Sequence, residues 1–231
     1  MNPAGRSLKA QDIVVAYRTS AGTAYALNLD SFEVAAGESV AIMGPSGSGK
    51  STLLGLLAGL ATPTAGTITV GESVISSLSE KARIRFRRQS LGMLYQSDNL
   101  LPHLTVEENV GFQLVIAGLS ADDGDVGAML ERLSLTELSA RLPDQLSGGQ
   151  RQRVAVARAV IHQPSIILAD EPTGSLDPDN AEAVIVALKE RRQEIGATLV
   201  VVTHDPHIAS SVGRIVELPP QTRSSKVSHD R

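Results

Sequence analysis

Gly44-Pro45-Ser46-Gly47-Ser48-Gly49-Lys50-Ser51 is the stretch that decides the fold, because it fits the phosphate-binding pattern G-x-x-x-x-G-K-[ST] at every fixed position. An apolar run at 39–43 precedes it, and from Thr52 onwards apolar residues follow at helical spacing. In this strand–loop–helix context the glycines let backbone N–H groups turn towards an anion, and the helix N-terminus adds its dipole. A chance match in a glycine-containing turn is the alternative, and it does not explain both flanks. The sequence therefore predicts that residues 44–52 bind a nucleoside triphosphate, with Lys50 supplying charge to the terminal phosphates and the Ser51 hydroxyl ligating Mg²⁺.

Four short runs in the chain are apolar throughout, as in strands that are buried on both faces. They end at Met43, Tyr95, Ala169 and Val202. Helical segments separate them, so we expect a parallel sheet. Polar groups follow each run: the phosphate loop, Gln96, Asp170-Glu171 and His204. Because ligands bind at the carboxyl edge of an open α/β sheet, the four strand ends are predicted to form one phosphate site.

The residues at these strand ends suit phosphoryl transfer to water, which needs charge neutralisation and a group that activates the water. Asp170 is predicted to hold Mg²⁺ together with Ser51, and Glu171 is the candidate general base. Gln96 and His204 are polar without being anionic, so they can contact phosphate oxygens or the attacking water; Gln96 is also a candidate metal ligand. With Lys50 these groups form the predicted catalytic set. The simpler alternatives are a helix N-terminal Glu171 and a packed core His204.

A second helix start of the anion-binding kind stands at Leu146-Ser147-Gly148-Gly149-Gln150. Ser147 is a good N-cap, and two glycines and a helical pattern follow it. One triphosphate hardly needs two such helix starts in one subunit. The stretch therefore indicates either a second ligand or a site that another copy of the chain uses.

Two charged segments have ordinary explanations that we favour. Five cations between 81 and 88 could dock an acidic partner, but such a run is more often a solvated helix face. Three aspartates between 122 and 125 suggest Ca²⁺, yet no Glu stands at the far end of the loop, so a solvated loop is the better interpretation.

Composition sets limits on the partners. Of the 231 residues, 42% are hydrophobic and 20% charged, with a formal net charge of −4, which is typical of one globular domain with a real core. The absence of an overall basic charge and of Trp, with 3% aromatic residues, argues against a nucleic-acid partner. The chain has no cysteine, which excludes disulfides and thiolate sites and suits a reducing compartment.

No targeting or membrane segment is expected. No apolar stretch follows residues 1–6 as in a signal peptide, and no apolar run approaches the ~20 residues of a membrane helix. We therefore expect a soluble protein that reaches a membrane only through a partner. The polar tail at 222–231 is expected to be disordered.

Taken in order, these motifs resemble those of an ABC transporter ATP-binding subunit. The stretch 44–51 resembles its Walker A loop, Gln96 the Q-loop, 146–150 the signature, and Asp170-Glu171 the Walker B motif. Gly174-Ser175-Leu176-Asp177 is similar to the D-loop and His204 to the H-loop. The resemblance covers roughly residues 10 to 218.

The resemblance implies an α/β fold with a P-loop NTPase core, a mostly parallel sheet and an N-terminal antiparallel β patch, all in a single domain over residues 1–231. The core would span about 1–95 and 164–231, with a helical subdomain inserted at about 96–163. The implied activity is ATP hydrolysis with ATP and Mg²⁺. ATP binding would form a head-to-tail homodimer, in which Ser147 and Gly149 of one copy complete the site of the other. Tyr17 matches the aromatic that stacks on adenine, and Tyr25 is the weaker match.

Within the family, 100–110 and 170–177 are similar to the branch that serves lipoprotein release, macrolide or peptide export, and cell division. Gly174-Ser175 replaces the Gly-Asn common there, and Tyr95 stands where Phe is usual. The resemblance implies a membrane-embedded permease partner, a peripheral place at the cytoplasmic face of the membrane, and export or mechanotransmission. The alternatives are a regulatory ATPase switch for a membrane-bound cell-wall process and a non-transport ABC ATPase of DNA repair or translation. The chain lacks the long coiled coil or the second domain of the latter.

Overall fold

The computed structural model describes residues 5–19, 22–120 and 125–221. Two expectations fall outside this range: the disordered tail at 222–231, and the two aspartates at 122 and 123 of the acidic loop. Within the described ranges, no helix combines the length and the apolar character needed to cross a bilayer.

An antiparallel sheet with strand order β2-β1-β4-β5 forms the N-terminal part, which confirms the predicted β patch. Its strands are β1 (Leu8–Thr19), β2 (Gly22–Val34), β4 (Ala65–Val70) and β5 (Ser73–Val74). The inward-facing side chains of β1 have even residue numbers before Asp12 and odd ones after it, a change of parity: Ala10 is buried on one side and Ile13 on the other. Asp12 itself has a left-handed φ of 52°. The irregularity keeps apolar side chains on the inner face from Leu8 to Val15.

The second sheet is parallel throughout, with the order β6-β7-β8-β3-β9. Its strands are β6 (Leu91–Leu94), β7 (Ile166–Asp170), β8 (Thr198–Val202), β3 (Ser39–Met43) and β9 (Arg214–Glu217). The four apolar runs therefore are parallel strands, as predicted. They end at one edge of the sheet because parallel strands share a direction.

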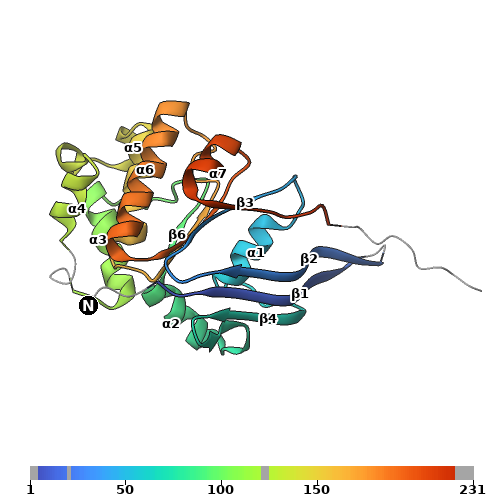
Figure 1. The fold of residues 1–231 in the computed structure, drawn as a ribbon. Helices are drawn as coiled ribbons and strands as arrows, with labels where there is room; N and C mark the ends of the chain where they lie inside the picture. Colours follow the sequence, from blue (N-terminus) through green and yellow to red (C-terminus); the bar gives the residue numbers. More distant parts are fainter. Residues whose placement is uncertain (1–4, 20–21, 121–124, 222–231) are drawn as a thin grey trace, which may run out of the picture.

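The sheet lies between two layers, and alternate residues face each of them (Figure 1). Val200 and Val202 of β8 pack in the cluster that contains the antiparallel sheet and α1 (Lys50–Leu57). Leu199 and Val201 pack in the cluster on the other side, against α5 (Gly148–Val160), α6 (Pro178–Ile195) and α7 (Pro206–Val212). Both faces exclude water, which is why these strands are apolar throughout.

The remaining helices are α2 (Glu80–Ser90), α3 (Val106–Ala117) and α4 (Val126–Arg132), with short 3-10 turns at Ile75–Ser77, Thr136–Leu138 and Pro143–Gln145. Side-chain caps start all three helices: Ser79, Thr105 and Asp125 each accept a backbone N–H. Asp125, one of the three neighbouring aspartates, accepts from Ala128 N at 2.8 Å and thus has a structural use.

The helices between residues 106 and 160 lie at one side of the molecule (Figure 1). Their apolar faces join the same hydrophobic cluster as Ile167 and Val201 of the parallel sheet. The helical insertion at about 96–163 therefore rests on the sheet through a shared core. Its division from the core at those boundaries stays a prediction.

Candidate functional site

The phosphate loop connects β3 to α1, as the strand–loop–helix pattern predicts. Gly49 has a φ of 89°, and a Cβ at this position would lie 2.7 Å from the Ala26 carbonyl oxygen, so only glycine fits. Lys50 Nζ donates to the carbonyl oxygens of Gly44, at 2.7 Å, and Pro45, at 3.0 Å. An ammonium has three donors, so Lys50 is held inside the loop with one donor left for a phosphate.

A cavity of about 430 Å³ lies over the loop. Its lining residues are Gly44, Ser46, Gly47, Gly49, Lys50, Ser51, Thr52, Glu171 and His204. Ser48 faces away from it: its side chain is fully buried, and its Oγ has no hydrogen-bond partner among the described residues. The structure thus brings the loop together with two of the predicted strand ends.

Glu171 and His204 meet at this cavity. His204 Nδ1 lies 3.2 Å from Glu171 Oε2, and Glu171 is the less exposed partner, at 25% against 68%. Glu171 has a left-handed φ of 45°, and its N–H donates to the Val202 carbonyl of the neighbouring strand at 2.9 Å. A strained non-glycine backbone at a strand end is typical of residues that are held for function.

Asp170 lies beneath the loop, where Ser51 Oγ donates to its Oδ1 at 3.4 Å. Burial raises the pKa of Asp170, the Ser51 hydrogen bond opposes this, the neighbouring Glu171 raises it further, and Lys50 lowers it. Ser51 Oγ and Asp170 Oδ1 are hard oxygen ligands that suit Mg²⁺. A cation bound there would favour the charged form of the Asp170 carboxylate. Within the described parts of the chain no three His, Cys, Asp or Glu side chains are grouped to hold a metal. Magnesium here would therefore complete its shell with water and substrate phosphates.

Gln96 lines the adjacent cavity, of about 570 Å³, together with Asp170, Ser175 and Gly148. Asp170 joins the two cavities, because it lines this one and bonds Ser51 of the other. The predicted convergence of four strand ends is thus spread over two neighbouring hollows, with Gln96 in the second.

Tyr17 is 59% exposed and lines an open cavity of about 550 Å³. Ser51 and Thr52 also line that cavity, so it continues directly into the phosphate loop. Tyr25, the weaker candidate, is 37% exposed and is not among its lining residues. An aromatic face at one end and a phosphate cradle at the other match the two ends of a nucleotide.

The stretch 146–150 begins α5 with a capping box. Ser147 Oγ accepts from Gln150 N at 3.3 Å, and Gln150 Oε1 accepts from Ser147 N at 2.8 Å. Ser147 and Gly148 are exposed, so this helix start is open to a ligand from outside the chain.

The stretch 174–177 packs against this helix start. Leu176 approaches Gly148, and a Cβ at Gly149 would collide with the side-chain amide of Asn180. Asp177 caps α6, accepting from Asn180 N at 3.1 Å and from Asn180 Nδ2 at 2.7 Å, and these bonds lower the pKa of Asp177. Ser175 lies in the cavity of Gln96. The two stretches therefore form one packed unit.

Two sets of contacts at the site were missed by sequence reasoning. Arg151 and Arg158 of α5 bind the loop after Gln96, and Gln221 donates to the Ser48 carbonyl at 3.2 Å while accepting from Asn28 N at 2.7 Å. These partners lie far apart in the chain and have no local pattern. The Asp177-Pro178 start of α6, by contrast, carries a readable cap signal.

Comparison with known proteins gives consistent matches. A protein family described as ABC transporter matches residues 27–174. The lipoprotein-releasing system ATP-binding protein LolD of Legionella pneumophila (strain Paris) is 44% identical over 213 residues, which cover 91% of this chain and 94% of LolD. The macrolide export ATP-binding/permease protein MacB of Shigella flexneri is 45% identical over 190 residues, 81% of this chain and 29% of MacB.

Solved structures agree with the sequence relatives. The dimeric structure of MJ0796, a bacterial ABC transporter cassette, superposes with a TM-score of 0.82 at 38% identity, covering 92% of this chain and 94% of that one. A second dimeric structure of the same cassette, in a post-hydrolysis state bound to ADP and Pi, superposes with a TM-score of 0.81 at 36% identity and covers 94% and 98%.

Proposed function

The chain belongs to the ABC transporter family, and from that premise we propose that it is the ATP-hydrolysing motor subunit of a transporter of the export or mechanotransmission type. The observation that carries the proposal is the cavity over the phosphate loop, where Lys50, Glu171 and His204 meet. The similarity to LolD and MacB confirms the predicted resemblance to the lipoprotein-release and macrolide-export branch. ATP is the proposed substrate.

The proposed roles follow from position. Lys50 and the loop N–H groups bind the β- and γ-phosphates, and Tyr17 stacks on the adenine. Ser51 and Asp170, with Gln96 from the adjacent cavity, would hold Mg²⁺, which supplies charge neutralisation at the phosphates. Glu171 and His204 act on the attacking water.

Glu171 is the proposed general base, because its carboxylate lines the cavity over the loop. His204 Nδ1 lies 3.2 Å from Glu171 Oε2, and this contact would orient the carboxylate and leave its other oxygen to take a proton from water. The left-handed backbone of Glu171 fixes the direction from which its carboxylate approaches the attacking water.

A homodimer forms on ATP binding in this proposal. The loop cavity contains no residue of α5, and the exposed helix start at Ser147 and Gly148 is suited to bind an anion. Ser147 and Gly149 of each copy would then contact the nucleotide held by the other. The similarity to dimeric cassettes supports this arrangement.

The membrane subunit would bind at a fourth cavity, of about 450 Å³, beside α2 and α3. Exposed apolar side chains line it: Leu60, Ile84, Tyr95 and Phe112. A mainly apolar cavity of this size accommodates one or two side chains of a partner helix.

Three arginines in the same cavity add a preference for an acidic partner. Arg87 donates to the Gly59 carbonyl at 2.7 Å, Arg88 to that of Ile116, and Arg158 to that of Asn99 at 2.7 Å. Their hydrogen bonds thus go to neutral acceptors, so a carboxylate would add charge complementarity. The proposed occupant is a permease segment with an apolar face and an acidic residue. Two of the five cations at 81–88 thus line this cavity, although a solvated helix face was the favoured interpretation.

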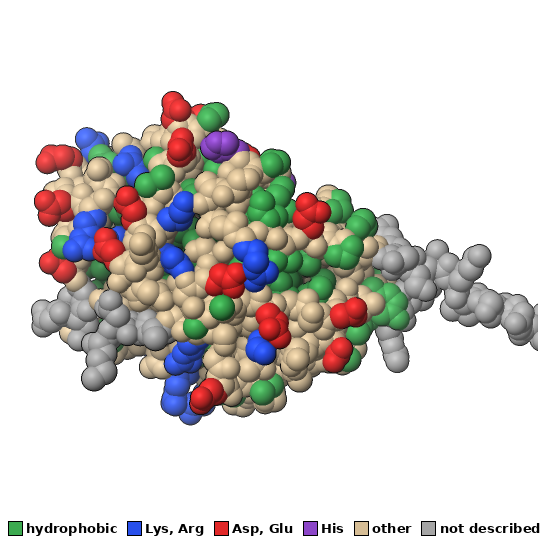
Figure 2. Space-filling model, viewed as in Figure 1, with side chains coloured by type: hydrophobic (Ala, Val, Ile, Leu, Met, Phe, Trp, Pro, Cys, Tyr) green, Lys and Arg blue, Asp and Glu red, His purple; other side chains and the backbone are tan. Residues whose placement is uncertain are grey.

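Binding to a permease gives the proposed location, peripheral at the cytoplasmic face of the membrane. On the face drawn in Figure 2, Lys and Arg side chains gather at the lower edge, where α2 lies in Figure 1, and elsewhere acidic and basic side chains are interspersed. A basic helix near the permease would also tolerate the negative surface of the membrane.

The test is Glu171→Gln in the full chain. We expect ATP turnover to fall by ~10²–10⁴, because the amide cannot accept the proton, while ATP binding persists and a dimer accumulates in gel filtration. Lys50→Ala should instead weaken ATP binding and yield no dimer. Glu182→Gln, an exposed residue of α6, is the matched control and should leave turnover unchanged. Near-normal turnover of Glu171→Gln would remove Glu171 as the base.

A further inference from the structure

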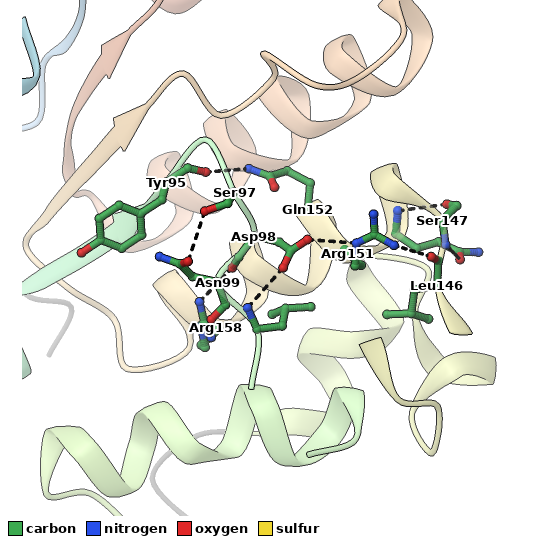
Figure 3. Close-up of polar contacts among 11 residues, drawn as sticks. Tyr95, Ser97, Asp98, Asn99, Leu146, Ser147, Arg151, Gln152 and Arg158 are labelled. Atoms are coloured by element: carbon green, nitrogen blue, oxygen red, sulfur yellow. Dashed lines mark hydrogen bonds and ion pairs between the residues drawn. The ribbon is translucent and has the colours of Figure 1, made fainter. Parts of the chain in front are cut away.

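The loop that follows Gln96 is tied to α5 by several hydrogen bonds (Figure 3). Gln152 Nε2 donates to the Tyr95 carbonyl at 3.3 Å, and Arg158 donates to the carbonyls of Asp98, at 3.0 Å, and Asn99. These bonds hold the backbone on both sides of Gln96 against one helix.

Arg151 adds the contact that connects the loop to the helix start. Its Nε donates to Asp98 Oδ2 at 2.9 Å, and its Nη1 donates to the Leu146 carbonyl at 2.7 Å. One guanidinium therefore hydrogen-bonds both to the loop of Gln96 and to Leu146, the residue before Ser147. Both ionic side chains are partly shielded, with exposures of 36% for Arg151 and 29% for Asp98.

Hydrogen bonds within the loop link its residues to one another. Asp98 Oδ1 accepts from Leu100 N at 3.2 Å, and Ser97 Oγ donates to Asn99 Oδ1 at 3.1 Å. Asn99 has a left-handed φ of 50°, which asparagine tolerates in a tight turn. A chain of contacts therefore leads from the loop of Gln96 through Asp98 to Arg151.

We propose that Asp98 and Arg151 are positioning residues that couple the two nucleotide sites of the dimer. The proposal rests on the proposed function, in which Gln96 serves the site of its own chain and Ser147 the site of the other. A nucleotide that draws Gln96 towards Asp170 shifts Asp98, and the guanidinium carries the shift to the carbonyl of Leu146. The helix start is then set for the partner's nucleotide.

The coupling is reciprocal, because linkage requires equal effects in both directions. When Ser147 binds the partner's nucleotide, the same two bonds place Gln96 in its own site. Each chain thus connects its own site to the other one, and the dimer contains this connection twice.

The first experiment isolates the connection within one chain. Amide hydrogen exchange is followed by mass spectrometry on the full-length chain, at a concentration where sedimentation shows monomers, with and without Mg-ATP. In the wild type we expect ATP to slow exchange both at 44–51 and at 146–154, the latter by at least about five-fold, the lower range for coupled sites. In Asp98→Asn and Arg151→Lys only the slowing at 44–51 should remain.

The variants are chosen to keep the fold. Asp98→Asn retains the shape and loses the charge, and Arg151→Lys retains the charge but places one nitrogen where two donors must reach different acceptors. Asp98→Glu should restore part of the ATP-dependent slowing. Lys9→Met, which breaks the exposed Lys9–Glu33 pair at 3.2 Å, is the control and should behave as wild type. General destabilisation would change exchange equally with and without ATP.

The outcomes separate the two proposals. If ATP leaves 44–51 unprotected even in the wild type, the proposed nucleotide site fails. If 44–51 is protected but 146–154 does not respond, or responds equally in wild type, Asp98→Asn and Arg151→Lys, the coupling is overturned. As a second measure, the Hill coefficient of ATP turnover should fall towards 1 in both variants, and an unchanged value above 1 would also overturn the coupling.

Discussion

His162 shows how a single buried residue makes stability depend on pH. It is 7% exposed, its Nε2 lies 3.2 Å from the Leu91 carbonyl, and its Nδ1 has no partner within the described residues. Burial lowers the pKa of His162 from 6.5 to about 4, against a smaller opposite effect of the Leu91 hydrogen bond. The ring is therefore neutral in the folded protein, with Nε2 carrying the proton.

Because the folded-state pKa lies below the unfolded one, the unfolded chain binds the proton first as pH falls. The stability that neutral His162 contributes is complete above pH 6.5 and is lost between about 6.5 and about 4. We expect this residue to account for about 2 kcal/mol of the loss in unfolding free energy between pH 7 and pH 5.

Denaturant unfolding at both pH values checks this prediction, with His162→Gln as the comparison. The variant should lose about 2 kcal/mol less than wild type over that interval, whatever its stability at pH 7. The described histidines His103, His204 and His207 are present in both proteins, so their contributions cancel in this difference. Equal losses in the two proteins would contradict a neutral, buried His162.

At the scale of elements, α5 has two duties at its N-terminus. The capping box of Ser147 and Gln150 satisfies the helix's own N–H groups, and the exposed side of the same turn is the proposed contact for the partner's nucleotide. Gly149 lets this turn pack against Asn180 of α6. Any side chain added there works against both duties.

Ser147→Arg separates the two duties. We expect the monomer to bind ATP normally, because the loop cavity contains no residue of α5, while ATP-dependent dimerisation is lost. Light scattering with and without Mg-ATP is the measurement. Ser79→Arg removes the N-cap serine of α2 and so matches the stability cost of about 1 kcal/mol; it should dimerise as wild type. A normal dimer of Ser147→Arg would refute the shared site.

At the scale of the whole molecule, the cavity of about 450 Å³ beside α2 and α3 forms a groove that is the expected contact for the permease. Phe112 lines it and is 40% exposed, whereas Val115 of the same helix is 67% exposed and is not among the lining residues. The two residues therefore distinguish a specific groove from general surface hydrophobicity.

Phe112→Arg should weaken co-purification with the membrane subunit by about 30-fold, as for the loss of an interface anchor worth about 2 kcal/mol. ATP binding should be unchanged, because Phe112 lies outside the loop cavity. Val115→Arg should co-purify as wild type. If both variants lose the partner equally, or neither does, the groove is the wrong contact.

Local pattern was enough to predict much of the fold. The phosphate loop, the parallel strands and most of the helices follow from short-range spacing and caps, since each depends on residues within a few positions of one another. Short elements were missed: α7 has only seven residues, too few for a periodic pattern, although Asp205 and Pro206 begin it. The parity change of β1 at Asp12 was missed for another reason, because it depends on the left-handed backbone of a single residue, which apolar spacing does not mark.

The sequence alone determined that a triphosphate-binding loop, an acidic strand end and a second glycine-rich helix start exist, because their chemistry is written in consecutive residues. Only the tertiary structure decided how they meet: that Gln96 lies in a second cavity, that Arg151 connects Asp98 with Leu146, and that Gln221 reaches Ser48. Such contacts join residues 53 and 173 positions apart. Their partners are selected by the packing of the sheets and helices, and no local spacing specifies that packing.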